Sequence, residues 1–195
     1  MCCLQKIRRA KDGGQVVIKD FELIERKTVE KTRVFEYCKD TLKLPDGRIT
    51  VYETLIHKGA AAVVPVLDDG RILLVRQYRH AINRVALEIP AGGRNSTDEP
   101  FIEAAKRELE EETGYRSDDL EHLISVVTAI AYCDEVIEVF VAKNLVPSSQ
   151  NLDPDEFIEV EAFEPEMLSK MIYEGKIQDS KTIAAIMSYL NTYRS

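Results

Sequence analysis

The residues best suited to chemistry in this 195-residue chain lie in one acidic segment, residues 107–112. On a helix, Glu108, Glu111 and Glu112 would share one patch, because residues three and four apart are neighbours. Like charges so placed repel, and a bound divalent cation would relieve that repulsion. Oxygen ligands without His or Cys favour Mg²⁺, with Mn²⁺ as an alternative. For this fragment alone, ordinary i,i+4 pairs among Glu103, Arg107 and Glu111 on a solvated face are the favoured explanation.

The acidic segment belongs to a longer pattern, Gly-x5-Glu-x7-Arg-Glu-U-x-Glu-Glu-x-Gly-U, in which U is apolar. This pattern resembles the Nudix box, and Tyr115 replaces the usual aliphatic residue at its last place. The resemblance implies that Glu99 braces the loop and helix and that Gly93 lets the backbone turn tightly. The residues that match in register are Gly93, Glu99, Arg107, Glu108, Leu109, Glu111, Glu112 and Gly114.

The resemblance also assigns roles in catalysis. It implies that Glu108 and Glu112 ligate the metals, and that Glu111 contributes to a further metal or to a metal-bound water. Arg107 would hold the carboxylates in place, which agrees with the need for a fixed cation beside several acids. The backbone carbonyl of Ala91 is expected as one more metal ligand.

The segments that precede the box, residues 74–79 and 87–92, narrow the range of candidate substrates. They are similar to those of ADP-ribose pyrophosphatases and related nucleoside diphosphate sugar hydrolases. Arg79, together with Arg76 and Glu88, would then face substrate phosphates and ribose, although a solvated strand end is the alternative for either arginine. The implied reaction is hydrolysis of the pyrophosphate bond of ADP-ribose to AMP and ribose 5-phosphate.

One departure from the ADP-ribose pyrophosphatases keeps other substrates open. Those enzymes usually carry a proline where this chain has Ile130, whereas the following Asp134 and Glu135 fit the subgroup. GDP-mannose, another nucleotide sugar or a dinucleotide is therefore an alternative substrate. A noncatalytic Nudix module that senses such ligands is an alternative of another class, and the intact carboxylates count against it.

The proton acceptor is expected in the loop before the last strand. Glu156 matches the glutamate that closes over the site in the resembling enzymes, and it completes a catalytic set with Glu111 and Arg107. A solvated acidic loop explains the same residues equally well, because Asp153 and Asp155 lie beside it.

The elements that must position these residues form an α/β protein. Strand-like runs with turn signals extend over 16–88, and Asp-Gly pairs predict two hairpins, one joining 38–44 with 48–57 and one joining 60–67 with 71–78. Continuous apolar runs predict strands covered on both faces, hence an α/β/α sandwich around a mixed sheet. Helical patterns cover about 100–113, 165–174 and 181–193, and further strands about 120–129, 136–142 and 157–163.

Composition limits the partners. The net charge of −8 and a pI near 5.1 argue against nonspecific binding to nucleic acid or anionic membranes, which requires a basic surface. No apolar run reaches the roughly 20 residues of a spanning helix, so a cytoplasmic location is expected. Cys2, Cys3, Cys38 and Cys133 lack zinc-site spacing and are interpreted as reduced thiols.

Two units are expected along the chain: an N-terminal β arm at 1–56 and a Nudix hydrolase domain at 57–195. In the resembling subgroup, N-terminal strands exchange between subunits, so the resemblance implies a homodimer built through the run 16–37. Phe35 or Tyr37 in that arm could stack on a base, or could pack in the core.

Overall fold

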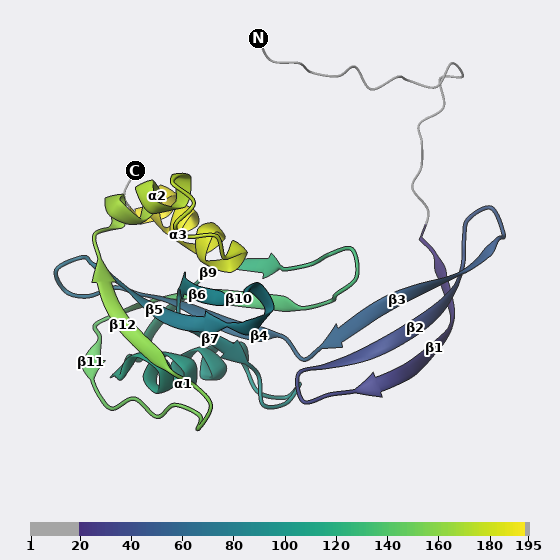
Figure 1. Cartoon of the computed structure of the whole chain (residues 1–195), viewed down its shortest axis with the longest axis horizontal. Helices are drawn as coiled ribbons and strands as arrows, with labels where there is room; N and C mark the ends of the chain where they lie inside the picture. The colour runs from purple at the N-terminus through teal and green to yellow at the C-terminus, as the bar shows by residue number, and fades with distance from the viewer. Residues whose placement is uncertain (1–19, 194–195) are drawn as a thin grey trace, which may run out of the picture.

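The computed structural model describes residues 20–193. A three-stranded antiparallel sheet forms an arm that projects from a body of sheets and helices (Figure 1). The predicted first hairpin is confirmed, with Gly47 at a φ of 87° in its turn. The predicted strands at 16–19 lie outside the described residues. The arm strands are β1 (Glu22–Lys31), β2 (Phe35–Lys43) and β3 (Ile49–His57).

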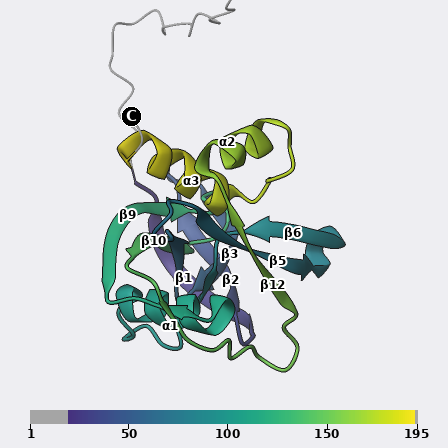
Figure 2. The ribbon, with the colours of Figure 1, turned by 90° about the vertical axis from the view of Figure 1, so that its left-hand side faces the viewer.

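A mixed four-stranded sheet forms the centre of the body, in the order β7-β4-β10-β9. The pair β4 and β10 is parallel, and the other neighbours are antiparallel. Figure 2 shows α1 on one side of the strands and α2 and α3 on the other. The predicted α/β/α sandwich is confirmed. These elements are β4 (Ala60–Pro65), β7 (Ala91–Gly93), β9 (Asp119–Val127), β10 (Val136–Lys143), α1 (Phe101–Thr113), α2 (Pro165–Tyr173) and α3 (Ser180–Tyr193).

The central strand β4 is buried on both faces, as its continuous apolar run predicts. Ala61 and Val63 point towards α1 and pack with Ala104 and Leu109 of that helix. The alternate residues of β4 pack instead with side chains of α3. This two-sided packing fixes α1 against the sheet and so sets where its carboxylates lie.

A second sheet has the order β12-β5-β6, and it corrects one prediction. Residues 60–67 and 71–78 do not pair as a hairpin: only an isolated bridge links Val66 and Ile72. The reason is that β10 and β7 already occupy both edges of β4, so β5 must pair elsewhere. The remaining elements are β5 (Ile72–Arg79), β6 (Arg84–Glu88), β8 (Tyr115–Arg116), β11 (Val146–Pro147), β12 (Ile158–Phe163) and the 3₁₀ turn η1 (His80–Ile82).

The helix ends follow the signals in the sequence. Gly114 ends α1 in the left-handed region at a φ of 70°, which glycine adopts readily. Asp179 caps α3 by accepting a 3.0 Å hydrogen bond from the backbone N–H of Thr182. Cys38 and Cys133 are free thiols, whereas Cys2 and Cys3 lie outside the described residues. Within 20–193, no helix has the length and apolar character needed to cross a membrane.

Candidate active site

Two acidic residues of α1, Glu108 and Glu112, face β7 rather than solvent. Glu108 and Glu112 are buried, with 8% and 4% of their surface exposed. Gly92 makes room for the first of them, because a Cβ added there would lie 2.1 Å from Glu108 Oε1. The close backbone approach expected at Gly93 therefore occurs at Gly92, while a Cβ at Gly93 would meet only open space.

Glu112 is held without a cationic partner. Its Oε2 accepts a 3.0 Å hydrogen bond from the backbone N–H of Ala91, and no cation of residues 20–193 lies within ion-pair distance of it. Burial, followed by the charge of Glu108, raises the pKa of the Glu112 carboxyl to about 8. Burial also raises the pKa of Glu108, even though Arg107 opposes that shift.

Arg107 links the box residues to one another. Its Nη1 donates to Glu108 at 2.5 Å and to Glu111 at 3.0 Å, while Nη2 donates to the carbonyl of Gly93 at 2.9 Å. Its Nε lies 3.3 Å from Glu99, which in turn accepts from the backbone N–H of Asn95. Arg107 therefore orients the acidic helix against the loop that leads into it.

The donor chemistry of this cluster fits a divalent cation. Glu108, Glu111 and the backbone of Ala91 line a cavity of about 680 Å³, and Glu112 lies against Ala91. All of these groups offer oxygen, and two buried carboxylates lack sufficient compensating charge. In residues 20–193, no three acidic, His or Cys side chains already stand close enough together to hold an ion.

Arg79 also lines this cavity, and it belongs to an ion cluster whose other members Glu88 and Lys181 are buried. Glu88 accepts from Arg79 Nε at 2.8 Å and from Arg79 Nη2 at 2.9 Å, and it also accepts from Lys181 Nζ. Lys181 is 8% exposed and lies 3.0 Å from Asp179. Despite its burial, Glu88 has its pKa lowered to about 2 by Arg79 and Lys181.

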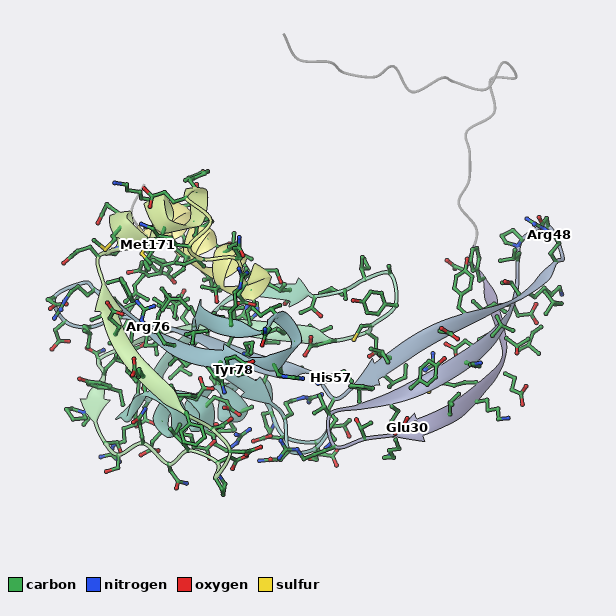
Figure 3. The ribbon with its side chains drawn as sticks, viewed as in Figure 1. Glu30, Arg48, His57, Arg76, Tyr78 and Met171 are labelled. Carbon is green, nitrogen blue, oxygen red and sulfur yellow. The ribbon has the colours of Figure 1, made fainter. Side chains whose placement is uncertain are left out.

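Arg76 is not brought to the cavity. It forms a 2.7 Å ion pair with Glu161 on the neighbouring strand β12. Figure 3 marks Arg76 and Tyr78 on β5, and His57 where β3 enters the body. Glu88 lies beneath Arg79 and Lys181, so it reaches the cavity only through these two side chains.

The loop before β12 brings Glu156 to the cavity. The charge of Glu156 is near enough to raise the pKa of both Glu108 and Glu112. Its Oε2 accepts a 3.2 Å hydrogen bond from the backbone N–H of Asp153, which keeps the loop folded back on itself. The structure thus places Glu156 on the same cavity as the box carboxylates.

The arm reaches the cavity through its β1–β2 turn. Arg33 and Val34 line the cavity, whereas Phe35 and Tyr37 do not. The guanidinium of Arg33 lies 3.9 Å from Asp153 in the Glu156 loop. The arm therefore meets the site through this turn and through His57 at the end of β3.

Lys181 and His57 are among the cavity residues that sequence reasoning missed. Lys181 was hidden because the segment before α3 reads as a helix cap, which Asp179 indeed supplies. His57 lines the cavity, and its Nδ1 accepts a 3.0 Å hydrogen bond from the backbone N–H of Gly59. The His57-x-Gly59 spacing is the only local signal for this contact.

Comparisons with known proteins gave matches in family, sequence and fold. A family model described as the NUDIX domain matches residues 56–186. The ADP-ribose pyrophosphatase of Bacillus subtilis strain 168 is 37% identical over 171 residues, covering 84% of this chain and 91% of that protein. The methanol dehydrogenase activator of Bacillus methanolicus is 36% identical over 172 residues, covering 85% and 92%. The crystal structure of an ADP compounds hydrolase shares the fold at a TM-score of 0.78 and 23% identity, covering 91% of this chain and 97% of that one.

Proposed function

The chain belongs to the Nudix family and is a Nudix pyrophosphohydrolase, and from this premise we propose that it hydrolyses ADP-ribose to AMP and ribose 5-phosphate. One observation carries the proposal: Glu108, a buried acid whose pKa burial raises, shares a cavity with Arg79, and a second buried acid, Glu112, lies against Ala91 in the lining of that cavity. The cations that line the cavity suit a diphosphate, and the acids suit the metal ion that accompanies such a substrate. The similar pyrophosphatase of Bacillus subtilis is named for ADP-ribose.

Nudix hydrolases generally use divalent metal ions, and we propose Mg²⁺ for this chain, with Mn²⁺ able to replace it. Glu108, Glu111, Glu112 and the carbonyl of Ala91 would hold the metal. When bound, it supplies charge neutralisation at the phosphate oxygens and lowers the pKa of a bound water. The support is the all-oxygen donor set around buried carboxylates.

The remaining chemistry falls to side chains of the chain itself. Arg107 keeps Glu108 and Glu111 in place, and Arg79 binds a substrate phosphate. Glu156 takes a proton from water as the water oxygen forms a bond to one phosphorus. The bridging P–O bond breaks, and its electron pair stays on the leaving phosphate.

A homodimer formed through the arm, residues 1–56, completes the proposal, with the hydrolase domain at 57–195. The support is the apolar surface of the arm: Leu23, Ile24, Val29 and Val51 are each about half exposed. Sedimentation of the full chain should give twice the protomer mass of 22.1 kDa. A monomer with full activity would contradict this part. The only further partner that we propose is the small nucleoside diphosphate substrate. We propose the cytoplasm as the location of the protein.

A substrate panel tests the proposed function. Purified protein with Mg²⁺ is given ADP-ribose, GDP-mannose and a dinucleotide, and AMP or GMP is measured directly. We expect ADP-ribose to have the highest kcat/KM and activity to vanish in EDTA. A higher kcat/KM on GDP-mannose would overturn the substrate, and no turnover of any compound would overturn the enzyme proposal.

A further inference from the structure

The first turn of α3 contacts two segments of the active site that are distant from it in sequence. Lys181 and Thr182 lie in this turn, and both are buried, with 8% and 0% of their surface exposed. Asp179 precedes them and accepts from the backbone N–H and the hydroxyl of Thr182, at 3.0 Å and 2.6 Å. This capping carboxylate fixes the conformation of residues 179–182, which we call the α3 turn.

Lys181 connects the α3 turn to the arginine that lines the cavity. Its Nζ donates to Glu88 and, at 3.0 Å, to Asp179. Glu88 in turn accepts from Arg79 Nε at 2.8 Å and from Arg79 Nη2 at 2.9 Å. These side chains therefore form one chain of ion pairs from the start of α3 to the end of β5. Arg79, whose side chain is 41% exposed, is the most accessible member of that chain.

The charge of Lys181 determines what a phosphate meets at Arg79. The positive charges of Arg79 and Lys181 balance the negative charges of Glu88 and Asp179. Without Lys181, the same group of side chains would carry a net negative charge beside the cavity. An uncompensated carboxylate repels a phosphate and attracts the neighbouring guanidinium to itself. Lys181 therefore leaves Arg79 available to bind an anion.

Thr182 connects the α3 turn to the backbone at the acidic cluster. Its Oγ1 accepts a 3.0 Å hydrogen bond from the backbone N–H of Ile89, and this contact is buried. Ile89 lies between β6, which ends at Glu88, and β7, which begins at Ala91. The hydroxyl of Thr182 thus gives this N–H the partner that a sheet would otherwise supply. Two residues further on, the N–H of Ala91 donates to Glu112 at 3.0 Å.

We propose that the α3 turn is a positioning element with two separate effects: Lys181 positions Arg79 for a substrate phosphate, and Thr182 positions the Ala91 backbone for the metal ion. Both residues act through other groups, Lys181 through Glu88 and Thr182 through the Ile89 backbone. Each contact spans 93 residues of sequence. This inference rests on the proposed pyrophosphate hydrolysis and adds positioning residues to the same site.

Lys181→Gln in the full-length protein tests the first effect. The amide can still donate hydrogen bonds to Glu88 and Asp179, so the change removes mainly the charge. KM for ADP-ribose at saturating Mg²⁺ should rise about ten-fold, which is the size of a lost hydrogen bond to a charged group. Mn²⁺ affinity of the free protein, measured by electron paramagnetic resonance, should stay within about two-fold. Lys176→Gln is the matched control and should change neither property, because Lys176 pairs with Glu174 and does not line the cavity.

Thr182→Val tests the second effect. It keeps the shape of the side chain but leaves the Ile89 N–H without its partner. Mn²⁺ affinity should fall about ten-fold, as when other groups that orient a metal ligand are removed, while KM for ADP-ribose at saturating Mg²⁺ should change less than about two-fold. Thr182→Ser keeps the hydroxyl and is the matched control. Circular dichroism verifies the fold, and Thr182→Ala replaces Thr182→Val if that variant does not fold.

Three results would overturn the proposal. An unchanged KM in Lys181→Gln would remove Lys181 from phosphate positioning, and equal Mn²⁺ affinity in Thr182→Val and Thr182→Ser would remove Thr182 from the metal site. Lower thermal stability of both variants with unchanged KM and Mn²⁺ affinity would show that the turn is purely structural. Each of these leaves the proposed function standing. No turnover of ADP-ribose by the unsubstituted protein would instead overturn the proposed function, and the Mn²⁺ comparison would still test Thr182.

Discussion

Glu88 and Glu112 are both buried glutamates that contact residues lining the active-site cavity, yet their electrostatic environments are opposite. The side chain of Glu88 is 4% exposed and contacts two cations, so its pKa falls to about 2. Glu112 is 4% exposed as a residue and has only a backbone N–H as partner, so its pKa rises to about 8. Burial costs each carboxylate a similar desolvation, and the protein compensates only one of them.

The difference separates a positioning residue from a proposed metal ligand. The charge of Glu88 is balanced by cations of the protein, and Glu88 holds Arg79 and Lys181 beside the cavity. Glu112 has no cationic partner in the fold, and a bound metal ion would supply the missing positive charge. Mutations that exchange charge for neutral amide should therefore have opposite effects on the stability of the metal-free protein at these two positions.

Glu112→Gln gives the largest expected effect. Removing a metal ligand should lower kcat on ADP-ribose about 10³-fold. The same change should raise the stability of the protein in EDTA by about 1 kcal/mol or more, because it removes a carboxyl group whose charged form is disfavoured by burial and then by the charge of Glu108. Turnover and thermal unfolding measure the two effects. Glu103→Gln, on the exposed face of α1, is the control and should alter neither; a loss of stability in Glu112→Gln would break the comparison.

Glu156→Gln should come next, with a fall in kcat of about 10²-fold while metal affinity is retained. The reason is that the proposed role of Glu156 is to accept a proton, and not to hold the ion. Single-turnover rates and a metal titration separate these properties. Asp155→Asn, a neighbouring change, should leave the rate within two-fold. Unchanged turnover in Glu156→Gln would move the role of base to Glu111.

The ion cluster around Glu88 should make stability depend on pH. The pKa of Glu88 in the folded protein, about 2, lies below its ordinary value of 4.5. Its contribution is therefore present above pH 4.5 and is lost as pH falls from 4.5 towards 2. The shift corresponds to about 3 kcal/mol, at 1.36 kcal/mol for each pKa unit.

Urea unfolding of Glu88→Gln checks this pH dependence. At pH 7 the variant should lose about 3 kcal/mol and bind ADP-ribose with a KM raised about ten-fold, as Arg79 loses its anchor. Between pH 4.5 and 3 it should lose less stability than the unsubstituted protein. Glu161→Gln, half-exposed on β12, serves as control. Equal acid sensitivity of Glu88→Gln and the unsubstituted protein would show that Glu88 is not the group responsible.

Arg76→Ala is expected to have the smallest effect, below about two-fold on kcat/KM. Its guanidinium pairs with Glu161 on a half-exposed surface, where such pairs contribute about 0–1 kcal/mol. Arg79→Ala provides the contrast on the same strand, with a loss of at least ten-fold. Steady-state kinetics on ADP-ribose compare the two variants. An equal loss of kcat/KM in both would show that Arg76 also acts at the active site.

The acidic helix could be predicted in full from the sequence. Its apolar spacing, Pro100 before its start and Gly114 after its end are local signals, and α1 spans Phe101–Thr113 as they indicate. The sequence analysis expects both arginines of β5, Arg76 and Arg79, at the substrate, and the strand period argues against that. Positions 76 and 79 are three apart, so they point to opposite faces, and only one of them can line the cavity.

The compensation of charge could not be predicted, because it depends on contacts between distant segments. Glu88 meets Lys181 across 93 residues, and Glu112 meets the backbone of Ala91 across 21. The second hairpin was wrong for a similar reason: the turn at Gly70 is present, with a φ of 89°, but the pairing of β4 with β10 is decided by the whole sheet. Local sequence patterns predict helices and strands well, whereas contacts between distant segments decide which charged side chains lack a partner of opposite charge.

The most direct test of the account is a Mn²⁺ titration of the free protein followed by electron paramagnetic resonance. The unsubstituted protein and Glu103→Gln should bind Mn²⁺ with the same affinity, and Glu112→Gln should bind it at least ten-fold more weakly. Mg²⁺ should displace the bound Mn²⁺ in competition. Equal Mn²⁺ affinity in Glu112→Gln and the unsubstituted protein would contradict the claim that the uncompensated carboxylates of α1 form the metal site.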